Sequence, residues 1–201
     1  MKTLEKAFAK QFIIPVLRHK DKKTLLNICA ALKDGGCRVF EITLMSDDAY
    51  DVIKALSKQG LLVGAGTVLD TKQEKKAAAA GAEFLLSPGF CPSLAQKAKL
   101  PYIPGIQTAT ELMRALRFGA ELIKFFPAQS SGGADAIAAL SAPFPQVKWM
   151  PTGGIEAKHL DGYRKAGVLC VGMGSQLFPK AEVEAKKWNL MAKRFREYSS
   201  R

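Results

Sequence analysis

Short runs of apolar and β-branched residues alternate along the chain with longer stretches in which apolar residues recur at helical spacing. Eight of the short runs are expected to be strands: 12–18, 37–44, 61–66, 82–88, 101–105, 120–127, 147–151 and 168–174. Amphipathic segments of helical length lie between them, for example 23–35, 48–60 and 71–83. Glycine ends several helical stretches, at Gly35, Gly60, Gly81 and Gly119, where a left-handed residue commonly stops a helix.

This alternation of strand and helix favours parallel pairing of the strands. Eight such units in 201 residues predict one α/β domain over residues 1–201, folded as a closed (β/α)8 TIM barrel with helices at its N- and C-terminal ends. An open, doubly wound sheet is the alternative. Segment 181–200 is expected to be the terminal helix, with its apolar side chains packed on the barrel: Val183, Trp188, Met191 and Phe195.

Composition changes this picture little. The chain is 48% hydrophobic and 24% charged, which is typical of a globular protein with a sizeable core. Neither a run of about 20 apolar residues nor a signal-peptide pattern occurs in the sequence, so we expect a cytoplasmic protein with no membrane association. The four cysteines are far apart and are expected to be reduced core thiols: Cys29, Cys37, Cys91 and Cys170.

The net charge of +12 raises the question of a nucleic-acid partner. The lysines are spread in small groups rather than in one dense tract, and aromatic residues are not interleaved with them, so we expect no nucleic-acid binding. The positive field would instead favour a small polyanionic substrate. His19 and His159 have no second ligand at metal spacing, so no bound metal is expected.

Alternation along the second predicted strand places Glu41 inside the barrel. Phe40, Ile42 and Leu44 share the face expected to pack on helices, which leaves Glu41 on the interior face between Val39 and Thr43. A carboxylate in an apolar strand is costly unless it is paired or used in chemistry.

The sixth predicted strand places a cation in the same interior. Leu122, Lys124 and Phe126 share one face of this strand, so Lys124 is expected near the carboxyl end of the strand, among apolar neighbours. One interpretation of Glu41 and Lys124 is a buried structural ion pair. The other is catalytic: an amine in apolar surroundings loses its proton more readily, can form a Schiff base with a ketone, and can use a nearby carboxylate to move protons.

Glycine-rich segments end the last two predicted strands. Thr152, Gly153 and Gly154 follow the seventh strand, and Gly174 and Ser175 end the eighth. Loops at these two positions form the usual phosphate site of a TIM barrel, because glycine lets backbone amides approach an anion. At the end of the third strand, Thr67 carries a hydroxyl that could bind a carboxylate or carbonyl oxygen, or could cap the following helix.

With these residues placed, the sequence resembles the 2-keto-3-deoxy-6-phosphogluconate (KDPG) and 4-hydroxy-2-oxoglutarate (KHG) aldolase family of class I aldolases. The matching strings run in order from Ile14 to Leu177: GGCRVFEITL, GAGTVL, SPG, IPGIQTATELM, IKFFPA, APFPQV, PTGGI and VGMGS. The resemblance implies a cytoplasmic homotrimer that cleaves a keto-acid sugar phosphate to pyruvate and glyceraldehyde 3-phosphate, in Entner–Doudoroff metabolism. No metal or organic cofactor is implied.

The family's residue roles transfer to individual positions of this chain. The resemblance implies that Lys124 forms the Schiff base, that Glu41 transfers protons and that Thr67 binds pyruvate. It also places Pro88 in the pocket wall. The phosphate loops of the family fall on Thr152, Gly153, Gly154, Gly174 and Ser175.

The sequence departs from the family pattern at two positions. Many members carry an arginine for the pyruvate carboxylate where this chain has Met45, and Arg18, at the end of the first strand, is our candidate for a partial replacement. Gln129 stands where many relatives have an acidic residue. Three alternatives therefore stay open: the same chemistry on KHG or on 2-keto-3-deoxy-6-phosphogalactonate, a sugar-phosphate isomerase or epimerase on the same barrel, and a basic nucleic-acid-binding protein.

Overall fold

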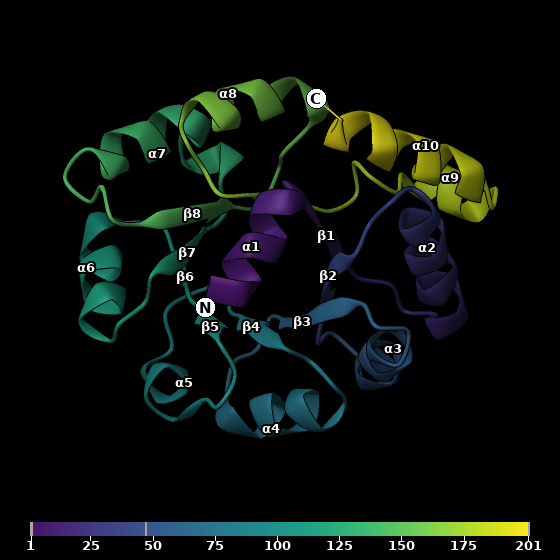
Figure 1. The fold of residues 1–201 in the computed structure, drawn as a ribbon, viewed down its shortest axis with the longest axis horizontal. Helices are drawn as coiled ribbons and strands as arrows, with labels where there is room; N and C mark the ends of the chain where they lie inside the picture. Colours follow the sequence, from purple (N-terminus) through teal and green to yellow (C-terminus); the bar gives the residue numbers. More distant parts are fainter. Residues whose placement is uncertain (1, 47, 201) are drawn as a thin grey trace.

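A computed structural model describes residues 2–46 and 48–200 of the chain. Each of the eight predicted runs contains a strand, and the fifth run is split into two, so the described residues form nine strands (Figure 1). The strands are β1 Ile13–Leu17, β2 Val39–Thr43, β3 Leu62–Gly66, β4 Phe84–Leu86, β5 Tyr102–Ile103, β6 Gly105–Ile106, β7 Leu122–Phe125, β8 Lys148–Pro151 and β9 Val171–Met173.

The prediction of a closed eight-stranded barrel is wrong. Six strands form a curled parallel sheet in the order β5-β4-β3-β2-β1-β9, a half-barrel, and β6-β7-β8 form a second, smaller sheet. Pro104 separates β5 from β6, and proline has no N–H with which to continue a ladder. Between β8 and β9 the regular pairing shrinks to one isolated bridge, between Thr152 and Gly172. The result is a (β/α) fold whose sheet is broken at two places.

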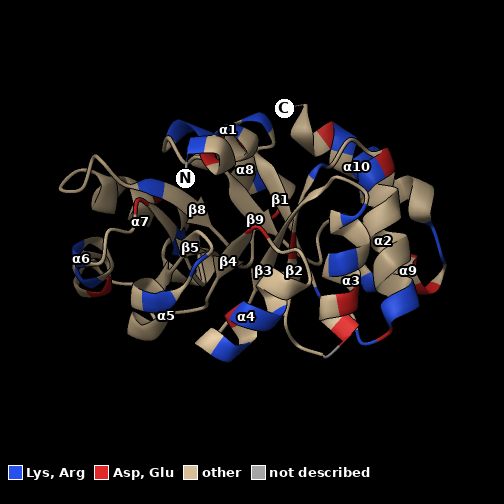
Figure 2. Cartoon of the chain, turned by 60° about the horizontal axis from the view of Figure 1, so that its bottom comes forward, with Lys and Arg blue, Asp and Glu red and all other residues tan. Residues whose placement is uncertain are grey.

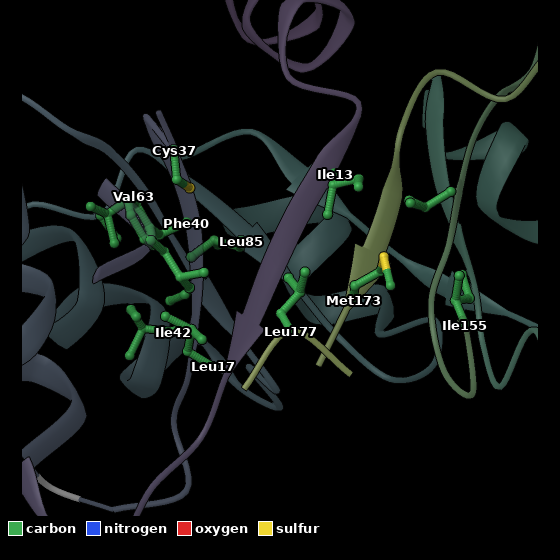
Figure 3. Close-up of a cluster of buried hydrophobic side chains, with 14 of the residues drawn as sticks. Ile13, Leu17, Cys37, Phe40, Ile42, Val63, Leu85, Ile155, Met173 and Leu177 are labelled. Carbon is green, nitrogen blue, oxygen red and sulfur yellow. The ribbon is translucent and has the colours of Figure 1, made fainter. Parts of the chain in front are cut away.

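The predicted strand faces are confirmed by the side-chain packing. Val39 and Leu122 lie in an interior cluster enclosed by the strands, together with Met150 and Cys170. The opposite faces, represented by Phe40 and Ile42, belong to the larger cluster between the strands and the helices (Figure 3). The alternation of side chains along each strand therefore determines which residues can reach the interior.

Ten α-helices occur in the described residues, and most lie around the outside of the strands (Figure 1). They are α1 Lys2–Lys10, α2 Lys22–Asp34, α3 Asp48–Ser57, α4 Thr71–Ala79, α5 Pro92–Lys97, α6 Ala109–Arg117, α7 Gly133–Ser141, α8 Leu160–Lys165, α9 Lys180–Glu184 and α10 Trp188–Ser199.

Three of the four predicted helix-ending glycines are confirmed as left-handed residues, and at the fourth helix end the left-handed residue lies one position later. Gly60, Gly81 and Gly119 have positive φ angles of 72°, 97° and 78°, as residues that stop a helix by turning left-handed. Gly35 instead stays right-handed, and the left-handed residue is Gly36. A Cβ on Gly35 would lie 2.6 Å from the Ala192 carbonyl oxygen, so this glycine allows α10 to pack closely on the end of α2.

Helices at both ends of the chain cover parts of the strand layer. Helix α1 crosses the middle of the molecule in Figure 1 and inserts Leu4 and Phe8 into the interior cluster, where Phe8 meets Phe84 edge-on. At the C-terminus, the single predicted helix is two helices, α9 and α10, which are separated around Lys186 with a φ of 53°. Met191 and Phe195 of α10 are fully buried, as predicted.

The charged residues do not gather on one face in Figure 2: Lys and Arg lie on helices on several sides, with acidic residues among them. Within the described residues, every helix is too short or too polar to cross a membrane. The four cysteines are free thiols, of which Cys29, Cys37 and Cys170 are buried as predicted, whereas Cys91 is half-buried. Burial raises the pKa of Cys29 to about 12.

Candidate active site

One cavity of about 480 Å³ collects all ten residues singled out from the sequence. It opens where the carboxyl ends of several strands meet. The lining residues that were predicted are Arg18, Glu41, Thr67, Pro88, Lys124, Thr152, Gly153, Gly154, Gly174 and Ser175. The parallel arrangement explains this convergence, because residues at the same end of neighbouring strands lie at the same edge of a sheet.

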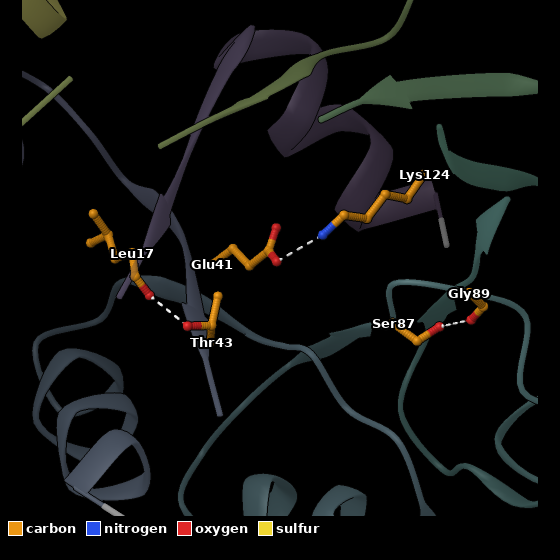
Figure 4. Close-up of polar contacts among 6 residues, drawn as sticks. All are labelled: Leu17, Glu41, Thr43, Ser87, Gly89 and Lys124. Atoms are coloured by element: carbon orange, nitrogen blue, oxygen red, sulfur yellow. Dashed lines mark hydrogen bonds and ion pairs between the residues drawn. The ribbon is translucent and has the colours of Figure 1, made fainter. Parts of the chain in front are cut away.

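Glu41 and Lys124 face each other across the interior. Lys124 Nζ lies 3.1 Å from Glu41 Oε1, with Glu41 fully buried and Lys124 5% exposed (Figure 4). The second carboxylate oxygen, Glu41 Oε2, is buried and has no hydrogen-bond partner among residues 2–46 and 48–200. A buried carboxylate with a spare acceptor beside an amine can receive a proton from a third group, which is the geometry that general base chemistry needs.

Glycine at position 66 makes room for this carboxylate. A Cβ on Gly66 would lie 2.2 Å from Glu41 Oε1 and 2.8 Å from Glu41 Cγ. Gly66 is the ladder partner of Thr43, two residues beyond Glu41 on β2. Any larger residue would therefore push the carboxylate out of its place beside Lys124.

The strand β7, which carries Lys124, is held by a neighbouring strand on each side. Lys124 is paired with Gly105 of β6 and with Met150 of β8, and its amide donates to the Pro104 carbonyl oxygen at 2.9 Å. The side-chain nitrogen of Lys124 lies 5.5 Å from the centre of the Phe126 ring, and both residues line the cavity. The lysine thus lies between two neighbouring strands, with the aromatic ring of Phe126 near its side-chain nitrogen.

The loops after β8 and β9 provide free backbone donors. Gly153 and Gly154 have φ angles of 105° and 72°, conformations that glycine adopts without strain. In the described part of the chain, no acceptor takes the amide hydrogens of Gly153, Gly154 or Ser175. Unengaged amides of this kind in glycine-rich turns form anion-binding concavities. The buried Thr152 hydroxyl beside them is likewise unpartnered among the described residues.

Thr67 does not cap a helix. The cap of α4 is Asp70, whose carboxylate accepts from the amides of Lys72 and Gln73. Thr67 itself has a φ of 59°, which is a strained conformation for a β-branched residue. Such strain occurs where the surrounding structure over-determines a residue, often at a ligand site. Of the two roles predicted for Thr67, the one that remains is a hydroxyl at the cavity wall that could bind a carboxylate or carbonyl oxygen.

Arg18 and Met45 lie together at the cavity mouth. The guanidinium Nη1 of Arg18 is 3.7 Å from Met45 Sδ, and Met45 is 58% exposed. Apart from Lys124, Arg18 is the one cation among the described residues that line the cavity. Gln129 contacts the loop after β8 through its backbone, whose N–H donates to the Gly153 carbonyl oxygen at 3.1 Å.

Sequence reasoning did not single out five lining residues: Val16, Ile155, Gly172, Gln176 and Phe178. Val16 could have been found, because it precedes Arg18 by two positions and so shares its strand face. Gln176 and Phe178 follow the end of β9, where the chain has no period from which a direction could be predicted. Over the described ranges, no three His, Cys, Asp or Glu side chains come together as a metal site requires.

A buried amine held beside a carboxylate, on a (β/α) fold with free amides at the same mouth, is the arrangement of a class I aldolase. Comparison with known proteins agrees. The model of the family described as KDPG and KHG aldolase matches residues 4–193, and the chain belongs to this family.

Two curated relatives illustrate the similarity. The chain is 43% identical over 188 residues to the 2-dehydro-3-deoxy-phosphogluconate aldolase of Pseudoalteromonas atlantica, covering 90% of this chain and 87% of the relative. It is 40% identical over 191 residues to the KHG/KDPG aldolase of Escherichia coli K12, covering 92% and 89%.

Two solved structures of aldolases are similar to the fold of this chain. The KDPG aldolase of Legionella pneumophila, with pyruvate captured as a covalent carbinolamine intermediate, has a TM-score of 0.89 at 37% identity and 97% coverage of both chains. The aldolase of Zymomonas mobilis ZM4 with 3-phosphoglycerate has a TM-score of 0.89 at 34% identity, covering 99% of this chain and 96% of the other.

Proposed function

We propose that this protein is a Schiff-base aldolase that cleaves KDPG to pyruvate and glyceraldehyde 3-phosphate. The observation that carries the proposal is the buried Lys124–Glu41 pair, 3.1 Å apart, in the cavity that also holds the free amides of Gly153, Gly154 and Ser175. The named activities of the curated relatives and the trapped pyruvate of the Legionella enzyme support the same chemistry.

In the proposed reaction, the neutral amine of Lys124 adds to the C2 ketone of the substrate. The carbinolamine takes up one proton and loses water to give a protonated imine, which withdraws electrons from the neighbouring carbon. The same proton is released when the pyruvate imine is later hydrolysed to the neutral amine. Glu41, directly or through a water, takes the proton of the C4 hydroxyl, and the C3–C4 bond breaks. The bonding pair moves onto C3 as an enamine while C4 leaves as the aldehyde.

The second half of the reaction returns the enzyme to its starting state. The enamine carbon takes up a proton to form the pyruvate imine, and water adds to that imine. Pyruvate leaves and the amine of Lys124 is free again. Glu41, which gained a proton in the cleavage step, is the proposed source of the proton for the enamine, so the number of protons balances over one turnover.

Binding of the remote groups would position the reacting carbons. The amides of Gly153, Gly154 and Ser175, with Gly174 and the Thr152 hydroxyl, would hold the phosphate. At the other end, Thr67 and Arg18 would hold the keto-acid carboxylate, with Pro88 as the wall beside it. Arg18 supports this assignment because its guanidinium lies against Met45, the position where many family members carry an arginine.

We also propose that residues 1–201 act as one domain, that the protein works as a cytoplasmic homotrimer without a cofactor, and that it serves an Entner–Doudoroff type of sugar-acid breakdown. These proposals rest on the resemblance of the sequence to the family, together with the continuous packing of α1 and α10 on the strands and helices between them.

The test of the proposed chemistry is reduction with borohydride in the presence of pyruvate, followed by intact mass and peptide mapping. We expect one pyruvyl adduct per chain, on the peptide that contains Lys124. The variant Lys124→Met should give no adduct at an unchanged fold, as judged by circular dichroism. Folded wild-type protein without an adduct in excess pyruvate would contradict the Schiff-base mechanism and favour a sugar-phosphate isomerase or epimerase.

A second substrate, KHG, is favoured by Met45. Without an arginine at this position, the cavity has fewer charges with which to select a particular keto acid, and the family includes KHG aldolases. The discriminating measurement compares kcat/KM for phosphorylated KDPG with that for KHG and for unphosphorylated 2-keto-3-deoxygluconate. If the phosphate contributes through the loops after β8 and β9, KDPG should be preferred by at least about tenfold.

A further inference from the structure

The hydroxyl of Tyr102 lies inside a chain of hydrogen bonds that closes the loop carrying Pro88. The amide of Cys91 donates to Tyr102 Oη at 3.0 Å, and Tyr102 Oη lies 2.5 Å from Ser87 Oγ. Ser87 Oγ in turn donates to the Gly89 carbonyl oxygen at 2.5 Å (Figure 4). One phenol on β5 therefore joins the beginning of this loop to its end.

The direction of each bond follows from the number of protons available. Ser87 Oγ donates its one proton to the Gly89 carbonyl oxygen. Tyr102 Oη, which accepts from the Cys91 amide, therefore donates to Ser87 Oγ at 2.5 Å in preference to the Gly89 carbonyl oxygen, which lies 3.3 Å away. Each hydroxyl then both donates and accepts, an arrangement in which the bonds strengthen one another. Burial raises the pKa of Tyr102, so the phenol keeps its proton at neutral pH.

The loop packs directly on the strand next to the catalytic lysine. A Cβ on Gly105 would lie 2.3 Å from the Pro88 carbonyl oxygen and 2.6 Å from the Ser87 carbonyl oxygen, so backbone touches backbone at this point. Gly105 is the ladder partner of Lys124. A shift of the loop would therefore move both a wall of the cavity and the strand that supports the lysine.

We propose that Tyr102 is a positioning residue for the pyruvate half of the reaction. Its hydroxyl holds Pro88 as a wall of the cavity and, through Gly105, keeps β6 in register with Lys124. Tyr102 is not among the described residues that line the cavity, so it acts through the loop rather than on the substrate. This inference rests on the proposed function, because it takes Lys124 as the residue that forms an imine with pyruvate.

The test is Tyr102→Phe, which removes one oxygen and keeps the ring. It leaves the Cys91 amide without its acceptor and Ser87 without its donor. In the condensation of pyruvate with glyceraldehyde 3-phosphate, we expect the KM for pyruvate to rise about tenfold, the effect of losing hydrogen bonds of ordinary strength. The KM for the aldehyde should stay within about twofold, since the proposed phosphate loops follow β8 and β9 rather than β4.

Two further variants separate positioning from general damage. Tyr163→Phe is the matched control, because the buried Tyr163 hydroxyl has no partner in the described part of the chain, and both KM values should stay at the wild-type level. Ser87→Ala removes the next link and should raise the KM for pyruvate in the same direction. Because both residues act through one chain of bonds, the double variant should be no worse than Tyr102→Phe alone.

Three results would overturn the proposal: an unchanged KM for pyruvate in Tyr102→Phe, equal rises in both KM values, or additive effects of the two substitutions. Borohydride trapping distinguishes this failure from failure of the proposed function. If wild-type protein forms no adduct on Lys124, the aldolase function fails and the role of Tyr102 with it. If wild type and Tyr102→Phe trap pyruvate with the same concentration dependence, only the positioning role fails.

Discussion

At the scale of single residues, the position of Arg18 at the cavity mouth makes it the proposed partner of the substrate carboxylate. Its guanidinium is the one cation besides Lys124 among the described lining residues, and it rests against the thioether of Met45. Methionine offers a carboxylate no charge-assisted hydrogen bond, whereas arginine can bind one in a bidentate manner. In the proposed function, the anionic end of the keto acid would therefore depend on Arg18.

We expect Arg18→Ala to raise the KM for the keto-acid substrate about tenfold or more, with a smaller change in kcat, because a charge-assisted bond to the bound carboxylate is lost. Steady-state kinetics over a range of substrate concentrations measures the effect. Met45→Leu serves as the control, since it keeps the volume at the mouth and leaves the arginine in place. An unchanged KM in Arg18→Ala would refute the assignment.

At the scale of elements, the close approach of β3 to β2 determines where the carboxylate lies. Gly66 leaves the space that Glu41 occupies, and Gly64, two residues earlier, leaves the space for the Phe84 ring. Both glycines lie on the same strand and on the same interior face. Only Gly66 touches a residue of the proposed chemistry, which makes the two positions a matched pair.

Gly66→Ala should reduce kcat by a factor of about 100, since general acid–base groups contribute roughly that much when they are correctly placed. Gly64→Ala overfills the interior in the same way and should cost comparable stability, on the order of 1–3 kcal/mol, while keeping kcat in the folded fraction. Urea unfolding and single-turnover kinetics on both variants test this prediction. Equal loss of kcat in the two would mean that crowding alone, and not the position of Glu41, matters.

The strands also illustrate what a periodic pattern can predict. Alternation placed Glu41 and Lys124 on interior faces, because side-chain direction along a strand is a local property. That the strands do not close into a barrel was not predictable in this way. Whether β5 and β6 continue as one strand depends on the hydrogen-bond partners on either side of Pro104, and those partners come from distant parts of the chain.

At the scale of the whole molecule, α9 and α10 are tied to each other and to the end of the β9 loop. Arg194 Nη1 donates to Glu182 Oε2 at 2.8 Å and to the Leu177 carbonyl oxygen at 3.1 Å. Arg194 Nη2 lies 2.5 Å from Glu182 Oε1, so the pair is bidentate. Hydrogen bonding to Arg194 lowers the pKa of the Glu182 carboxyl.

A carboxyl with a lowered pKa stabilises the folded state above its unfolded pKa, and this contribution is lost as the pH falls through the folded value. We therefore expect Arg194→Met to reduce the free energy of unfolding by about 1 kcal/mol at pH 7. The difference from wild type should shrink below about pH 4, where Glu182 is protonated in the unfolded chain.

Urea titrations at pH 7 and pH 3 measure that difference. Lys193→Met removes the neighbouring exposed pair of Lys193 with Glu197, 3.7 Å apart, and should change the free energy of unfolding little at either pH. A destabilisation by Arg194→Met that is the same at pH 3 and pH 7 would mean that the apolar part of the arginine stem, rather than its pairing with Glu182, holds the two helices together.

The sequence by itself determined the number of strand-forming runs, the face on which each side chain lies and the edge at which the predicted site residues meet. These are consequences of period and of parallel order, and both are carried by local sequence. The sequence also predicted the kinds of groups involved, an amine, a carboxylate and glycine loops, because each type has a restricted chemistry.

Only the tertiary structure decided how these groups touch. The 3.1 Å contact of Lys124 with Glu41, the strained Thr67 and the link from Tyr102 through Ser87 to Gly89 all join residues that no local pattern relates. The separation of β8 from β9, whose pairing is reduced to the single bridge between Thr152 and Gly172, belongs to the same group. Whether two groups lie within hydrogen-bond distance depends on how the whole core packs, and packing is a property of many residues together.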